Sequence, residues 1–158
     1  MSAFHPRNDP PSWWDRTRAS PFVLVALWSV IVGAELALMP IFPEFTPSPS
    51  LGELPDWTAL ALAAGLVLGG LMATVGLWNA WENRTKAWSL ERGGWIIVAA
   101  AHTAYAVVVI REYPGSTIAW GAPLVSAFMA LIRVAAIKAM KADAHRAKKQ
   151  IAADLESM

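Results

Sequence analysis

Two ionisable side chains, Glu35 and His102, lie inside otherwise uncharged apolar runs of the chain. An ionisable group at membrane depth costs a few kcal/mol on insertion scales, so such residues are the first place to look for function. Together they could form a proton relay or a site that titrates near neutral pH. We favour simpler roles: Glu35 is solvated at the interface or pairs structurally with Arg111, and a neutral His102 donates to a backbone carbonyl.

Depth in the membrane bears on which pair can form. At about 1.5 Å per helical residue, Glu35 lies roughly 21 Å from the start of its run, His102 about 12 Å and Arg111 about 26 Å from the start of theirs. Arg111 is therefore slightly closer in depth to Glu35 than His102 is. This spacing favours an ion pair that locks two helices together over a relay.

No other group of residues points to catalysis, a metal or a cofactor. The chain has no cysteine, which excludes disulfides and thiolate ligands. His5 and His145 lie near the chain ends, and no carboxylate stands at ligand spacing from His102. Neither a hydroxyl nucleophile with a nearby base nor a glycine-rich phosphate loop can be assembled. We therefore predict no enzyme and no cofactor. The net charge of only +1 predicts no nucleic-acid partner.

Four apolar runs must position these side chains: residues 21–39, 57–78, 94–110 and 116–137. A helix needs about 20 residues to cross a bilayer, where an unpaired backbone finds no water. Hydrophobic residues make up 56% of the chain, and the mean hydropathy is +0.40. The sequence therefore predicts an all-α membrane protein with four transmembrane helices. Pro123 removes one helical hydrogen bond and predicts a bend in the fourth helix.

The first run has an alternative interpretation as the core of a secretory signal peptide. Arg16 and Arg18 precede it, and Val32-Gly33-Ala34 resembles a cleavage site. The run continues past that site and a long polar region precedes it, so we favour a membrane helix.

Polar segments separate the four runs. Residues 1–20 are predicted to be an interfacial arm, and residues 40–56 a proline-rich acidic loop. Residues 79–93 are predicted to be a short interfacial segment, a partial helix at most, closed by Gly93-Gly94. Tryptophan and arginine favour the membrane interface, so five residues are predicted to be interface anchors: Trp57, Trp78, Trp81, Trp95 and Arg133.

Basic residues alternate along the chain in a way that predicts its orientation. The arm carries three Lys or Arg residues, the first loop none, the second loop three, the third loop one, and the end of the fourth run with the tail six. Basic residues concentrate on the cytoplasmic side of membrane proteins. We therefore predict that both termini and the second loop are cytoplasmic, in a bacterial inner membrane.

Small residues recur every four positions on the second run and again on the fourth. Such spacing lets helices approach to backbone distance, within one subunit or between subunits. The predicted helix-packing residues are Ala61, Gly65, Gly69, Ala73, Ala122, Ser126 and Ala130.

Residues 138–158 continue the helical pattern as a basic cytoplasmic tail. Ile137, Ala144 and Ile151 fall seven apart and could begin a coiled coil. A solvated basic helix lying against anionic headgroups is the interpretation we favour.

The layout of this chain resembles that of bacteriophage holins, which accumulate in the inner membrane and then open it. The features shared are a cysteine-free bundle, a short basic arm, small-residue helix faces and a charged tail. The resemblance implies a viral, membrane-permeabilising homo-oligomer whose partner is the lipid bilayer. The alternatives are an accessory subunit that docks a partner membrane protein, and a small channel or carrier that uses Glu35 and His102.

Overall fold

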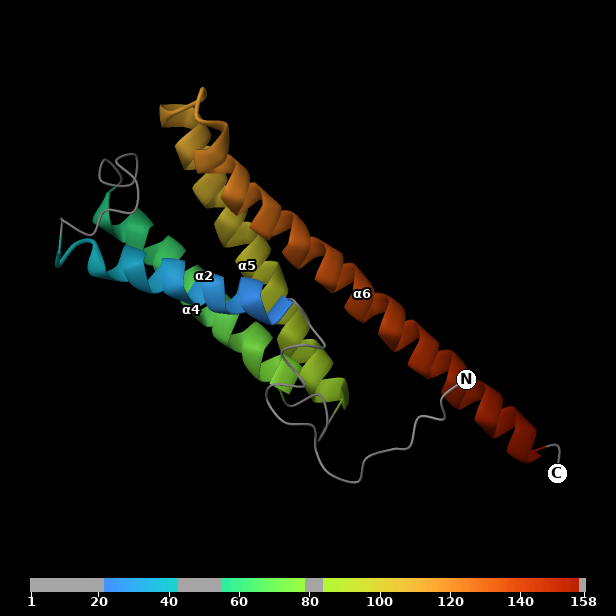
Figure 1. The fold of residues 1–158 in the computed structure, drawn as a ribbon. Helices are drawn as coiled ribbons and strands as arrows, with labels where there is room; N and C mark the ends of the chain where they lie inside the picture. Colours follow the sequence, from blue (N-terminus) through green and yellow to red (C-terminus); the bar gives the residue numbers. More distant parts are fainter. Residues whose placement is uncertain (1–21, 43–54, 79–83, 157–158) are drawn as a thin grey trace.

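The computed structural model describes residues 22–42, 55–78 and 84–156, and Figure 1 labels its helices. In these residues it forms α2 (Phe22–Leu38), α4 (Asp56–Trp78), α5 (Arg84–Glu112) and α6 (Thr117–Glu156), and no strand. The predicted all-α class is therefore confirmed. The arm, most of the proline-rich loop and Trp81 lie outside the described residues.

Three helices are long and apolar enough to cross a membrane: α4, residues 86–112 of α5, and α6. The apolar helix α2 has only 17 residues, or about 26 Å, against a hydrocarbon core of about 30 Å. These helices are compatible with an integral membrane protein. A fourth span and the orientation of the termini stay predictions.

Helices α2 and α4 lie side by side and run in opposite directions (Figure 1). Two glycines let their backbones come close. A Cβ atom at Gly33 would lie 2.9 Å from the carbonyl oxygen of Ala63, and one at Gly70 would lie 2.7 Å from that of Ala26. Any larger side chain at these two positions would push the helices apart.

Helix α5 begins at Arg84, so the predicted start at Gly94 was wrong. The pair Gly93-Gly94 does not close a helix there but lies inside one. A Cβ atom at Gly94 would overlap the backbone nitrogen of Ala73, and one at Gly76 would lie 2.5 Å from the Cβ atom of Glu91. Glycine costs about 1 kcal/mol within a helix, but here it allows α4 and α5 to cross at backbone distance.

The predicted small-residue stripe on α4 faces α5 over part of its length. Gly69 and Ala73 are buried in this contact, Gly65 is half-buried and Ala61 is exposed. Around Ala61 and Gly65 the two helices leave a shallow apolar groove, whose other wall includes Ile97 and Ala101 of α5. Most of the stripe is therefore used inside the subunit, and its N-terminal end is uncovered.

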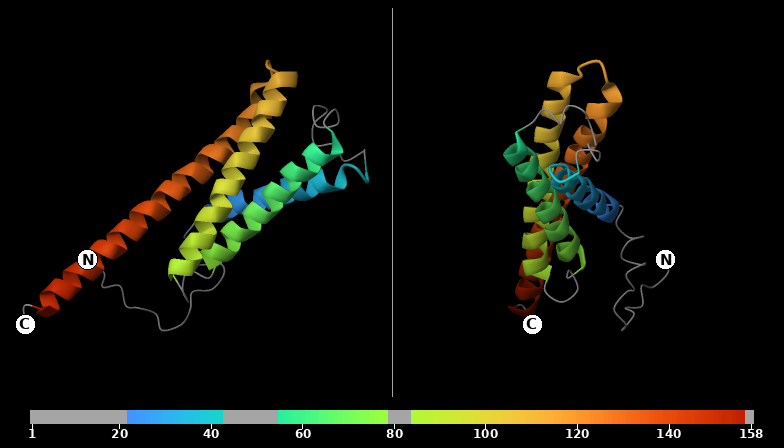
Figure 2. Two further views of the ribbon diagram at one scale, coloured as in Figure 1. Left: turned by 180° about the vertical axis from the view of Figure 1, so that it is seen from behind. Right: turned by 90° about the vertical axis from the view of Figure 1, so that its left-hand side faces the viewer.

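Helix α6 packs against α5 and then extends beyond the other helices (Figures 1 and 2). It runs for 40 residues without interruption, through Pro123, which makes it about 60 Å long. All side chains from residue 142 to residue 156 are exposed. The predicted helical continuation is thus present, and its position relative to the headgroups stays a prediction. The bend at Pro123 stays a prediction.

Of the small residues predicted to pack on this helix, Ala130 is buried against α5, Ser126 is half-buried and Ala122 is exposed. Helix α2 contacts α6 only sparsely. The ring of Phe22 lies edge-on to Trp95 of α5, with centroids 6.0 Å apart, and under the guanidinium of Arg133 of α6, 5.4 Å from its centre. The start of α2 is thus held between α5 and α6.

Candidate functional site

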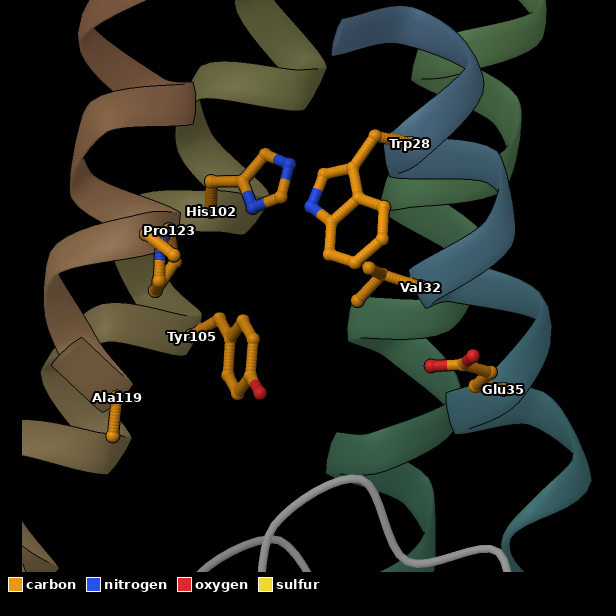
Figure 3. Close-up of a pocket in the computed structure, with 8 residues that line it drawn as sticks. Trp28, Val32, Glu35, His102, Tyr105, Ala119 and Pro123 are labelled. Carbon is orange, nitrogen blue, oxygen red and sulfur yellow. The ribbon is translucent and has the colours of Figure 1, made fainter. Parts of the chain in front are cut away.

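A cavity of about 190 Å³ lies where α2, α5 and α6 meet (Figure 3). It brings together Glu35 and His102, the two intramembrane residues singled out from the sequence. Aromatic and aliphatic side chains complete its lining, which consists of Trp28, Val32, Tyr105, Ala119, Ala122 and Pro123. Trp28 and Tyr105 have no place in the sequence prediction, because single aromatic residues in an apolar run carry no spacing that marks a site.

His102 is buried, with 1% of its surface exposed, and its Nε2 atom lies 3.0 Å from the hydroxyl oxygen of Ser29 on α2. The Ser29 hydroxyl donates its single proton to the carbonyl oxygen of Val25, at 2.8 Å. The Ser29 oxygen must therefore accept from His102, which places the imidazole proton on Nε2. His102 thus contacts a hydroxyl on a neighbouring helix, where the sequence suggested a backbone carbonyl.

This tautomer leaves His102 Nδ1 as an unprotonated acceptor. It is buried and has no hydrogen-bond partner. The Ser29–His102 contact is not an activated nucleophile, because the serine proton points to Val25 and the serine is fully buried. The contact fixes the ring, and in Figure 3 the second ring nitrogen faces the cavity.

Glu35 is half-buried on α2, and its carboxylate points toward the cavity wall that carries Tyr105 (Figure 3). The structural pair with Arg111 that the sequence favoured is absent. Arg111 is exposed at the end of α5 and lies 3.8 Å from its neighbour Glu112. Within the described part of the chain, Glu35 forms no ion pair.

A second polar cluster lies closer to the start of α5. The carboxylate of Glu91, with 1% of its side chain exposed, receives Arg133 Nε at 2.7 Å and Trp95 Nε1 at 3.3 Å. Its second oxygen, Oε2, is buried and has no hydrogen-bond partner.

This cluster corrects two predicted interface anchors. Trp95 is fully buried, because it hydrogen-bonds Glu91 one turn away and packs on Phe22. Arg133 does not extend to the interface but pairs with the buried carboxylate across the α5–α6 contact. Trp57 and Trp78 are both exposed, and their role as interface anchors stays a prediction.

Glu91 has no place in the sequence prediction, since residues 79–93 were expected to be interfacial. Once α5 is continuous from Arg84, the spacing is plain: Glu91, Trp95, His102 and Tyr105 follow one another at four, seven and three positions, which keeps them on one helix face. A helix boundary placed at Gly94 concealed this pattern.

We call the two clusters together the polar seam, formed by Ser29 and Glu35 of α2, Glu91, His102 and Tyr105 of α5, and Arg133 of α6. It follows one face of α5 over the 15 residues from Glu91 to Tyr105, a rise of about 21 Å. In the described residues, no group of three His, Asp or Glu side chains could hold a metal ion. The seam offers charge, hydrogen bonding and space for water.

Comparison with protein-family models, with curated proteins and with solved structures found no match for this chain.

Proposed function

We propose that this chain is a small integral membrane protein that permeabilises its membrane as a homo-oligomer, in the manner of a holin. The polar seam is the observation that carries the proposal. It provides ionisable side chains over about 21 Å of helix, some two thirds of the hydrocarbon thickness.

Helices α2 and α6 both contribute side chains to the seam, and they are the least extensively packed of the main helix pairs. Separation of these helices in a single subunit would expose charged groups to lipid, at a cost of a few kcal/mol each. Several subunits that turned their seams toward one another would instead enclose a water-filled lumen, where polar side chains are tolerated. Single subunits are therefore expected to stay closed, because a separated seam would face lipid. Oligomers are expected to open, because their seams would face water.

The groove beside Ala61 and Gly65 supports association between subunits. Small residues on an uncovered helix face allow another helix to approach closely. In this proposal α2 is a fourth span that thins the bilayer around it, both termini are cytoplasmic, and the basic extension of α6 remains on the cytoplasmic side of a bacterial inner membrane.

The test is inducible expression in a bacterium while membrane potential and viability are followed through time. The double variant Glu91→Leu/Arg133→Leu removes the buried ion pair from the polar seam. Apolar replacement of both partners of a buried pair is often neutral for stability. We expect this variant to insert but to delay or abolish the collapse of potential. The matched control is Arg111→Leu/Glu112→Leu, which removes an exposed pair and should leave timing unchanged.

Equal timing in both double variants would contradict a role for the seam, and growth with intact potential in the wild type would refute permeabilisation. A steady leak from the start of expression, without a sudden late collapse, would indicate the small channel instead. Gly65→Leu fills the groove and should reduce oligomer size, whereas Ala64→Leu, on an exposed face outside the groove, should not.

An accessory membrane subunit is the second candidate, favoured by the exposed extension of α6 beyond Met140. The side chains from residue 142 to residue 156 are all exposed, so this part of the helix is accessible to a partner. Truncation after Met140 should then abolish recovery of a partner membrane protein while the bundle remains folded, and unchanged permeabilisation by the truncated chain would favour the first proposal.

A further inference from the structure

The cavity between α2, α5 and α6 carries a negative charge that the described residues do not balance. Glu35 lines it and forms no ion pair among the described residues. Arg111, the partner that its depth in the membrane suggested, contacts Glu112 instead. A carboxylate in a low-dielectric setting is costly without a compensating positive charge. A ligand that supplied this charge would be favoured over an anion or a neutral molecule.

His102 Nδ1 adds a second requirement. It is a buried acceptor with no hydrogen-bond partner, and the donation from Nε2 to Ser29 holds it in that role. A buried acceptor left unpaired lowers stability, so a donor is expected to reach it directly or through water. The ligand should therefore bring N–H or O–H donors as well as charge.

The size and walls of the cavity set the third requirement. Its volume of about 190 Å³ is about six times the ~30 Å³ that one water molecule takes up in the liquid. The rings of Trp28 and Tyr105 line it (Figure 3), and aromatic faces attract organic cations. Val32 and Pro123 add apolar wall. Room remains for a small hydrocarbon group beside the charge.

We propose that this cavity binds a small protonated amine. The ammonium group balances Glu35 and donates hydrogen bonds to Glu35 and to His102 Nδ1, and its organic group lies against Trp28 and Tyr105. A bare metal ion fits less well, because no three ligands converge in the described residues. The site does not depend on permeabilisation, since it exists in the closed bundle.

The probe is benzylamine, a protonated primary amine at neutral pH, compared with benzyl alcohol, its neutral analogue of similar shape. Binding is measured by calorimetry on the full chain in lipid nanodiscs, with empty nanodiscs as the lipid-partition background. We expect benzylamine to bind at least about tenfold more tightly than benzyl alcohol, because only the amine supplies charge. N,N,N-trimethylbenzylammonium, which keeps the charge but lacks N–H donors, should bind less tightly than benzylamine.

Three variants locate the site. Glu35→Gln should weaken benzylamine binding about tenfold or more, whereas Glu112→Gln, which changes an exposed carboxylate at the end of α5, should leave it unchanged. His102→Leu should reduce the preference for benzylamine over its trimethylated analogue, because one of the two hydrogen-bond acceptors is lost, while retaining the preference for charge.

Trp28→Leu tests the site without altering a buried residue. Because Trp28 is half-exposed, its replacement should leave the fold intact even if the buried variants fold poorly. It should weaken benzylamine binding, and Trp57→Leu, at an exposed tryptophan outside the cavity, should not. Equal binding of amine and alcohol, or equal effects of the Glu35 and Glu112 substitutions, would overturn the proposal. Tight amine binding by a chain that never collapses the membrane potential would refute the proposed function alone.

Discussion

The ion pair between Glu91 and Arg133 should respond asymmetrically to removal of its two partners. Glu91 is 1% exposed, and Arg133 is 17% exposed at its side chain. Removal of one partner from a buried pair costs about 3–5 kcal/mol, because the other charge is left uncompensated. Arg133→Met leaves a fully buried carboxylate, so it should lower the free energy of unfolding by about 4–5 kcal/mol, the upper end of that range. Glu91→Leu leaves a long side chain that can reach water, so we expect about 2–3 kcal/mol.

The double variant Glu91→Leu/Arg133→Met tests whether the two residues stabilise the bundle as one pair. Because it leaves no orphaned charge, its cost should be smaller than the sum of the two single costs by at least about 2 kcal/mol. The assay is reversible unfolding in mixed detergent micelles, followed by helical circular dichroism, for the wild type and the three variants.

Lys141→Met is the control for loss of a basic side chain on α6. Its Nζ atom lies 3.2 Å from the Ser89 hydroxyl in an exposed contact, so its removal should cost less than about 0.5 kcal/mol. Additive single costs, to within about 0.5 kcal/mol, would refute the inference that Glu91 and Arg133 form one buried unit.

Three further predictions follow from the packing. Gly76→Ala should destabilise the bundle by about 1–3 kcal/mol, because its Cβ atom would meet the α5 backbone, whereas Gly115→Ala, with nothing within 4 Å, should change stability little; equal unfolding midpoints would contradict the close crossing. Ser29→Ala should cost about 1–3 kcal/mol, because it leaves His102 Nε2–H unpaired, and a nitrogen chemical shift of that ring unchanged from wild type would count against the assigned tautomer. Truncation after Met140 should leave the unfolding midpoint of the bundle nearly unchanged, because the side chains from residue 142 to residue 156 are exposed; a lower midpoint would show that the extension stabilises the fold.

The sequence did not predict which polar residues lie together. Depth along helical runs placed Arg111 nearer to Glu35, but depth says nothing about which way a helix is rotated. In the structure Arg111 points out at the end of α5, and Glu35 shares a cavity with His102. The rotation of α5 depends on the Gly76 and Gly94 contacts with α4, which no local pattern encodes.

The apolar run lengths by themselves determined the all-helical class, the approximate extents of α2 and α4, and the start of α6. They also isolated Glu35 and His102 among apolar residues. The reason is that a backbone without water must hydrogen-bond within its own helix. Only the tertiary structure decided that α5 continues through Gly93-Gly94, that Trp95 and Arg133 turn inward, and that Glu91 is buried. The physical reason is that burial of a charge depends on a partner from another helix. Glu91 and Arg133 are 42 positions apart in the chain, and each is tolerable in the interior only because the other is there.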